Sequence, residues 1–171
     1  MTKKIVIIDD NFAIRQVIKI FLTRLSRNDS FDLNIFSTDN GVEGLGYVYI
    51  TNPNIVIVDT TLPKYSGREV LDYFAQNPKF QESGINVIVL HEENRSDLKL
   101  PNNFHVISKN QKGSFRLIVQ TIDKILGTSE TSNARNLIER IGNFILSNGN
   151  KDDLLLKSIT DEAFPKTILN R

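Results

Sequence analysis

The feature that most constrains the fold is a regular alternation of short apolar runs with longer segments of helical periodicity. Five runs have the length and the β-branched character of buried strands: residues 4–8, 32–36, 55–58, 86–90 and 104–107. The third and fourth runs are almost entirely apolar, which is typical of strands covered on both faces. A strand–helix unit repeated five times predicts an α/β fold with a doubly wound, five-stranded parallel sheet.

The helices are predicted between these runs. The first has a face of apolar residues three or four positions apart: Ile14, Val17, Ile18, Phe21, Leu22 and Leu25. A second helix is expected to begin at Asp39-Asn40-Gly41 and to run through Ile50. A third is expected from Ser66 to Asn77, where Pro78 stops it.

Two further helices are expected before residue 128. Residues 94–100 allow a short helix ahead of Pro101. The last helix is predicted to have Ser114 as its N-cap, because a hydroxyl at that position accepts a hydrogen bond from the first turn. Gly127 is expected to close it.

The character of the chain changes after Gly127, so we expect a domain at residues 1–127 and a helical extension at 128–171. One helical stripe in the extension consists of Leu137, Ile138, Ile141, Phe144 and Ile145. Such a stripe is not stable in water alone, and we expect it to pack on the domain or on a second copy in a homodimer. A second apolar segment, residues 154–159, predicts another helix.

Acidic side chains follow two of the predicted strands. Asp9 and Asp10 come directly after the first run, and Asp59 ends the third. The carboxyl ends of neighbouring parallel strands meet at one edge of the sheet, where open α/β sheets bind their ligands. Three carboxylates that converge there repel one another unless a hard cation such as Mg²⁺ neutralises them. The pattern predicts a metal site, with Asp59 as a possible phosphate acceptor.

Composition excludes several classes of function. The net charge of +1, from 21 basic and 20 acidic residues, gives no electrostatic basis for binding nucleic acid or a membrane surface. The absence of cysteine excludes disulfides, thiolate metal sites and cysteine nucleophiles. No apolar run approaches a membrane span, and the N-terminus leads straight into the first run, so we expect a cytoplasmic protein.

Three motifs together resemble the receiver domain of two-component response regulators, over about residues 3–127. They are the acidic pair Asp9-Asp10, the segment from Asp59 to Pro63 with Gly67 after it, and Lys109 at the end of the fifth run. Each motif alone is a weak signal. Their placement at the ends of the first, third and fifth strands of a five-fold β-α order is specific.

The resemblance implies a flavodoxin-like, receiver-type fold and a role for each residue. Asp59 would accept a phosphoryl group from a phosphohistidine on a histidine kinase or phosphotransfer protein. Asp10 and Asp59 would hold Mg²⁺ directly, the Thr61 backbone carbonyl would be a third ligand, and Asp9 would act through water. Lys109 would contact the phosphoryl oxygens. Receivers of this family often dimerise and signal through a downstream protein partner.

Thr60 and His91 are further candidates for contact with the phosphoryl group. His91 stands where the family has Thr or Ser at the end of the fourth strand, and it either donates an N–H to the site or points to solvent. Val106 or a neighbour replaces the family's switch aromatic, and Asn110 replaces its usual proline. The segment between His91 and Lys109 is also short.

These departures leave two hypotheses for signalling. The domain accepts phosphate and reports it by another route, or it is a pseudo-receiver that acts as an interaction scaffold without phosphorylation. A third alternative is DNA binding, because Gly149-Asn150-Lys151 is faintly similar to a helix-turn-helix of enhancer-binding regulators, although the extension is neutral.

A haloacid-dehalogenase-type phosphatase, which also has an aspartate nucleophile, needs a second aspartate where this chain has Thr61. We therefore expect no enzyme.

Overall fold

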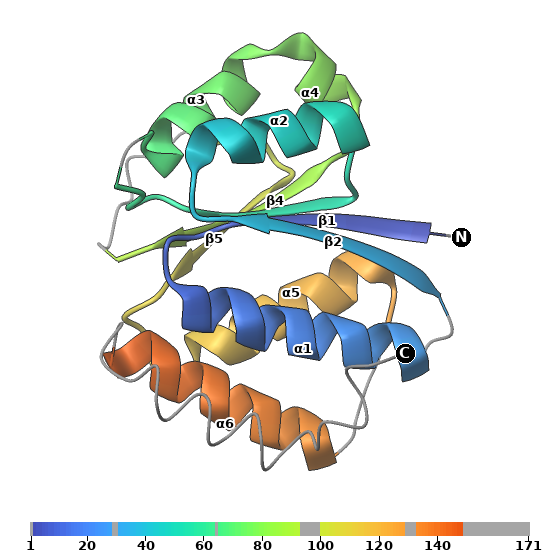
Figure 1. Cartoon of the computed structure of the whole chain (residues 1–171), viewed down its shortest axis with the longest axis vertical. Coiled ribbons are helices and arrows are strands. Elements are labelled where there is room, and N and C mark those ends of the chain that lie inside the picture. Colours follow the sequence, from blue (N-terminus) through green and yellow to red (C-terminus); the bar gives the residue numbers. More distant parts are fainter. Residues whose placement is uncertain (1, 29–30, 64, 93–99, 129–132, 149–171) are drawn as a thin grey trace.

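The computed structural model describes residues 2–28, 31–63, 65–92, 100–128 and 133–148. A five-stranded sheet lies between two layers of helices (Figure 1). The strand order is β2-β1-β3-β4-β5, and every neighbouring pair is parallel. This order confirms the predicted doubly wound parallel sheet of the flavodoxin-like, receiver type.

All five predicted strands are present, and their ends differ from the prediction by two residues at most. Their bounds are β1 Thr2–Ile8, β2 Asp32–Thr38, β3 Ile55–Asp59, β4 Asn86–His91 and β5 Phe104–Ser108. Every residue of the central strand β3 is buried, including Asp59 at its end. The Asp59 carboxylate is therefore buried at the C-terminal edge of the sheet.

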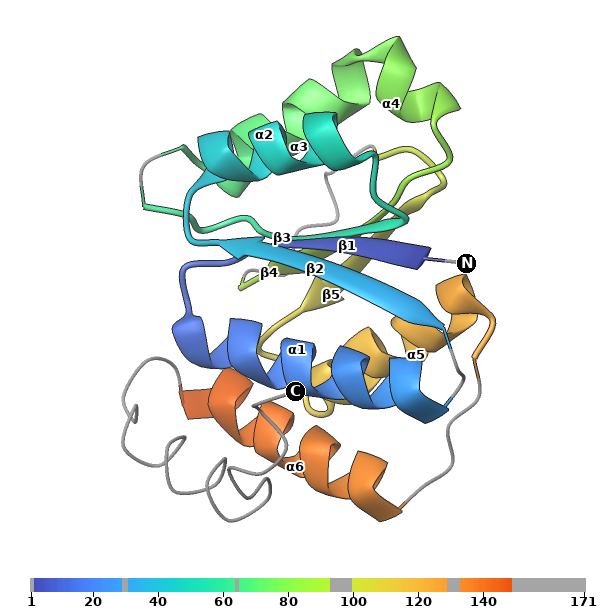
Figure 2. The ribbon, with the colours of Figure 1, turned by 45° about the vertical axis from the view of Figure 1, so that its right-hand side comes forward.

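Six helices are described: α1 Phe12–Asn28, α2 Gly41–Thr51, α3 Gly67–Gln76, α4 Pro78–Glu82, α5 Ser114–Leu126 and α6 Asn133–Asn148. Helices α2, α3 and α4 cover one face of the sheet, and α1 and α5 cover the other (Figures 1 and 2). Helix α6 lies outside α1 and α5 and contacts both of them.

The alternation of strand side chains separates the core into two halves. Ile5 and Ile7 of β1 face α1 and α5, whereas Val6 and Ile8 face α2 and α3. Ile138, Ile145 and Leu146 of α6 are buried in the first half. The described part of the extension thus shares its core with the sheet. Phe144, which the predicted stripe included, is 43% exposed instead.

Two predicted helix starts are confirmed by their caps. The Asn40 side chain accepts hydrogen bonds from the N–H groups of Val42 and Glu43 at the start of α2. Ser66 and Glu69 form a reciprocal capping box at the start of α3. Each cap is formed by residues within three positions of the helix start, so both helix starts can be recognised from the sequence.

The prediction of Ser114 as the N-cap of α5 is wrong. The N-cap is Gly113, whose φ of 82° is left-handed, and Ser114 is the first helical residue. The Ser114 hydroxyl instead donates to the backbone carbonyls of Lys109 and Gln111. The left-handed glycine makes this possible because it turns the chain one residue before the serine.

Pro78 ends α3 as predicted but also begins the short helix α4, which was not predicted from the sequence. Proline is compatible with a first turn because its missing N–H needs no partner there. The helix predicted at residues 94–100 falls, except for Leu100, outside the described residues, as do the 154–159 helix and the segment 149–151. No helix in the described ranges is long and apolar enough to cross a membrane.

Candidate functional site

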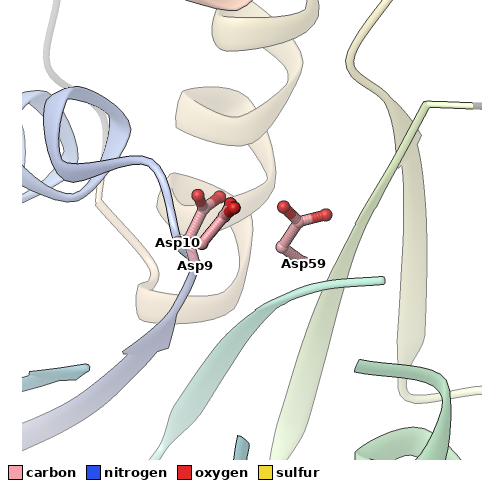
Figure 3. Close-up of side chains that lie close together, drawn as sticks. All are labelled: Asp9, Asp10 and Asp59. Carbon is pink, nitrogen blue, oxygen red and sulfur yellow. The ribbon is translucent and has the colours of Figure 1, made fainter. Parts of the chain in front are cut away.

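Three carboxylates meet at the C-terminal edge of the sheet, as predicted. Asp9 and Asp10 follow β1, and Asp59 ends β3 (Figure 3). One oxygen from each lies within 4.8 Å of the other two. Asp9 and Asp59 are fully buried, and Asp10 is exposed at the rim. Since oxygen ligands at this spacing suit a hard divalent cation, the cluster is a candidate metal site.

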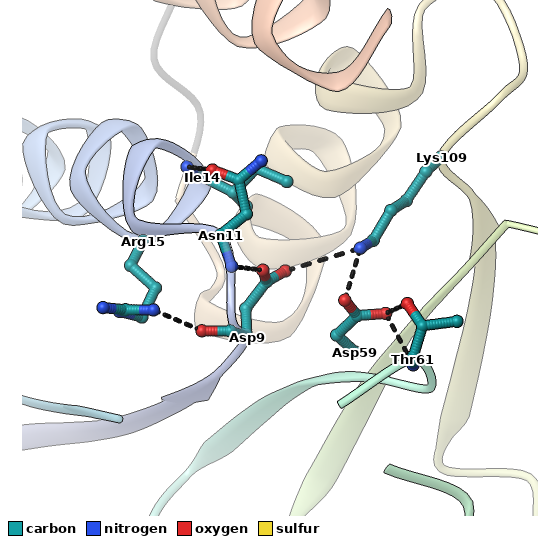
Figure 4. Close-up of polar contacts among 7 residues, drawn as sticks. All are labelled: Asp9, Asn11, Ile14, Arg15, Asp59, Thr61 and Lys109. Atoms are coloured by element: carbon teal, nitrogen blue, oxygen red, sulfur yellow. Dashed lines mark hydrogen bonds and ion pairs between the residues drawn. The ribbon is translucent and has the colours of Figure 1, made fainter. Parts of the chain in front are cut away.

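Both oxygens of Asp59 are engaged by donors from the same chain (Figure 4). The Lys109 Nζ donates to Oδ2 over 2.5 Å. The Thr61 N–H and hydroxyl donate to Oδ1 over 3.1 and 3.0 Å. The buried carboxylate is therefore held in one orientation by three hydrogen bonds, one of them from a cation.

Asp9 is held less completely than Asp59. Its Oδ1 accepts a hydrogen bond from the Asn11 N–H at 2.8 Å. Its Oδ2 is buried and has no hydrogen-bond partner among the described residues, and the Lys109 Nζ lies 3.9 Å from it (Figure 4). A buried carboxylate oxygen without a donor is costly, and a bound cation would remove that cost.

Burial and the excess of negative charge both shift the pKa values of Asp9 and Lys109. Burial raises the pKa of the Asp9 carboxyl to about 7; Lys109 opposes this rise, and Asp59 and Asp10 add to it. For Lys109, burial alone would lower the pKa, but Asp9 and Asp59 outweigh it and raise the pKa above its usual value. Lys109 is therefore charged at neutral pH.

The loop after β3 passes very close to Asp59. A Cβ atom added at Gly67 would overlap the backbone carbonyl of Asp59, so only glycine fits at this position. The Thr60 N–H donates to the Leu90 carbonyl over 2.9 Å, which extends the pairing of β3 with β4 by one residue. These contacts place Thr61 where its two donors reach the carboxylate.

Two of the residues that depart from the family pattern, His91 and Asn110, lie next to Lys109. The His91 carbonyl accepts a hydrogen bond from the Lys109 N–H at 2.7 Å, and the His91 side chain is only 6% exposed, so it does not point to solvent. The Asn110 side chain donates to the Glu92 carbonyl over 2.5 Å, which ties the loop after β5 to the loop after β4. Val106 on β5 is 43% exposed.

Three side-chain contacts that position the site were not predicted from the sequence. Arg15 of α1 donates from Nη1 to the Asp9 carbonyl over 2.5 Å. The Thr61 side chain and the Ser114 hydroxyl make the other two. A hydroxyl two residues after a carboxylate is a known local hydrogen-bonding pattern and could have indicated Thr61. The contact of Arg15 depends on the path of the chain between β1 and α1, and no local sequence pattern predicts that path.

The family follows from a match to a protein-family model. Residues 5–109 match the model of the response regulator receiver domain. This match covers more than half of the chain and includes all the site residues named above from Asp9 to Lys109. The chain belongs to the response regulator receiver domain family. Interaction with histidine kinases or phosphotransfer proteins is the general property of such domains.

Curated relatives are similar over a part of this domain. The virulence-factor transcription regulator BvgA of Bordetella pertussis is 34% identical over 71 residues, which are 42% of this chain and 32% of BvgA. The cell cycle response regulator CtrA of Brucella abortus is 35% identical over 68 residues, 40% of this chain and 27% of CtrA. The chain spans less than a third of the length of these relatives.

Solved structures share the fold over a larger part of the chain. The Mn²⁺-bound form of response regulator Rcp1 is 26% identical, with a TM-score of 0.57 over 75% of this chain and 97% of Rcp1. The signal receiver domain of a DNA-binding response regulator from Colwellia psychrerythraea is 18% identical, with a TM-score of 0.59 over 74% of this chain and 99% of that domain.

Proposed function

We propose that this chain is a response regulator whose Asp59 accepts a phosphoryl group from a phosphohistidine on a histidine kinase or phosphotransfer protein. An oxygen of Asp59 would bond to phosphorus while the bond from phosphorus to the imidazole nitrogen breaks, which gives an acyl phosphate and a free histidine. The observation that carries the proposal is the buried Asp59 between Lys109 and the carboxylates of Asp9 and Asp10.

The same proposal includes Mg²⁺ as the cofactor. Asp10 and Asp59 would hold it directly, with the Thr61 carbonyl as a further ligand and Asp9 acting through water. The unpartnered Oδ2 of Asp9 and the spacing of the three carboxylates fit such a cation. A Mn²⁺-bound relative, Rcp1, supports the choice of a divalent metal. When bound, the cation would neutralise charge that develops on the phosphoryl oxygens.

Lys109 would supply the second positive charge of the reaction. Its ammonium group already lies on Asp59, so it is placed to move onto a phosphoryl oxygen. Thr60 and His91 are the remaining candidates for contact with the phosphoryl group, because Thr60 directly follows β3 and His91 ends the neighbouring strand β4. No residue in this arrangement is proposed to turn over a substrate, so the chain would act as a signalling protein and not as an enzyme.

The division of the chain is also part of the proposal. Residues 1–127 would be the receiver domain, and residues 128–171 a helical extension of which α6 packs on α1 and α5. Output would pass to a downstream protein partner or through a homodimer in the cytoplasm, without nucleic acid or membrane. The neutral charge balance supports this route over DNA binding.

The test is mass spectrometry of the full chain after treatment with acetyl phosphate in Mg²⁺. We expect a mass gain of one phosphoryl group on Asp59 that disappears in Asp59→Asn and persists in the control Asp72→Asn, where an exposed aspartate of α3 is changed. Chelation of Mg²⁺ should abolish the gain. An unlabelled wild type, with acetyl phosphate and with a phosphohistidine donor, would contradict the proposal and favour a scaffold that acts without phosphorylation.

A further inference from the structure

The backbone of Lys109 is hydrogen-bonded to the first turn of α5. The Ser114 hydroxyl donates to the Lys109 carbonyl over 2.9 Å, and Ser114 is 1% exposed. The turn between them is closed by the Ser114 N–H, which donates to the Gln111 carbonyl over 3.2 Å. A movement of the Lys109 backbone therefore moves the start of α5, because few torsions in this short turn are free to absorb it.

The start of α5 is capped by another element. A helix leaves its first N–H groups unpaired, and normally the N-cap side chain accepts from one of them. Gly113 has no side chain to do this. Instead, the Phe115 N–H donates to the Asn143 Oδ1 of α6 over 3.0 Å. Asn143, which is 28 positions from Phe115 in the sequence, therefore takes the place of an N-cap side chain.

Two further contacts hold α6 against the same turn. Gly142 lies directly on the Phe115 ring, where a Cβ atom would overlap the ring carbons. The Arg116 Nε donates to Glu139 Oε2 over 3.1 Å. Consecutive residues of α5 are thus linked to the Lys109 loop by Ser114 and to α6 by Phe115 and Arg116.

We propose that Asn143 is a positioning residue for Lys109, and that the docking of α6 and the phosphorylation of Asp59 are coupled through it. This inference rests on the proposed function of Asp59. A phosphoryl group adds anionic oxygens that attract the Lys109 ammonium group. The resulting shift reaches the first turn of α5 and so the hydrogen bond to Asn143. Asn143 holds the first turn of α5, and Ser114 ties that turn to the Lys109 carbonyl, so loss of the Asn143 side chain leaves Lys109 less well placed for the transferring phosphoryl group.

The first experiment measures the rate of Asp59 phosphorylation at increasing acetyl phosphate in saturating Mg²⁺. We expect Asn143→Ala to lower the maximal rate roughly fivefold, because Lys109 is then less well placed, with little change in the half-saturating donor concentration. Asn143→Asp, which keeps an acceptor for the Phe115 N–H, should restore most of the rate. The control Asn136→Ala, on an exposed position of the same helix, should react as the wild type does. Equal rates in all variants would overturn the proposal.

The second experiment compares two states of the wild-type chain and so does not depend on how the Asn143 variants fold. Amide hydrogen exchange across α6 is compared before and after phosphorylation, with Asp59→Asn treated in the same way. We expect exchange within α6 to change about tenfold in the wild type only. Phosphorylated wild type with unchanged α6 exchange would overturn the coupling and leave the proposed function intact. Failure of Asp59 to become phosphorylated would reject the proposed function itself.

Discussion

At the scale of single residues, the site is unbalanced in charge. Three carboxylates face one ammonium group, and two of the carboxylates are fully buried. Thr61 and Lys109 satisfy both oxygens of Asp59, so the imbalance falls on Asp9, whose Oδ2 has no donor. Asp9 is therefore the residue at which removal of negative charge should help the protein most when no metal is bound.

We expect Asp9→Asn to stabilise the metal-free protein at high pH. The folded-state pKa of Asp9 is about 7, above its value of 3.8 when unfolded. The stability that Asp9 contributes is full below pH 3.8 and is lost as the pH rises through 7. Urea unfolding in chelator should give Asp9→Asn an advantage of roughly 2 kcal/mol at pH 8 that shrinks towards pH 5.

The control for this prediction is Asp72→Asn, at an exposed position of α3 outside the cluster. It should show little change in stability between the two pH values, because an exposed carboxylate stays hydrated when the chain folds. An advantage of Asp9→Asn that is equal at pH 5 and pH 8 would mean that the burial of charge is not its cause.

At the scale of elements, glycines in two helices have opposite roles. Gly67 begins α3 against the Asp59 carbonyl, where a Cβ atom does not fit, whereas Gly46 of α2 faces open space. We expect Gly67→Ala to destabilise the fold by about 1–3 kcal/mol through forced displacement of the loop. Gly46→Ala should stabilise it by about 0.5–1 kcal/mol because alanine is the better helix former. Denaturant unfolding of both variants checks the signs, and a loss of stability in both would contradict this account.

The elements also show what a sequence can predict. The strands and the helix starts near Asn40 and Ser66 agree with the prediction, because apolar periodicity and helix-start residues act over a few positions. The start of α5 was not, because its cap comes from Asn143 in a different helix. The convergence of Asp9, Asp10 and Asp59 followed from strand order alone. The unpartnered oxygen of Asp9 and the contact from Arg15 depend on side-chain packing, which no local pattern encodes.

At the scale of the whole molecule, α6 closes the side of the fold formed by α1 and α5 (Figure 2). Ile138, Ile145 and Leu146 are buried against this side. Removal of residues 128–171 should therefore leave an apolar surface in water. We expect such a truncated chain to associate in a concentration-dependent manner beyond the full chain in sedimentation velocity.

A peptide of residues 133–148, added to the truncated chain, should reduce this association because it can cover the same surface. A truncated chain that sediments like the full chain at every concentration would show that α6 is not needed to cover α1 and α5.

The shared core of α6 and the sheet has an evolutionary consequence. Gly142 can lie on Phe115 only while neither residue gains bulk, so the outer faces of the receiver and its extension are not free to change independently. A helix packed in this way is not expected to be exchanged for an unrelated segment in a single recombination event. Descendants of this gene are therefore expected to keep the receiver and α6 together, or to lose α6 only after the surfaces of α1 and α5 have become polar.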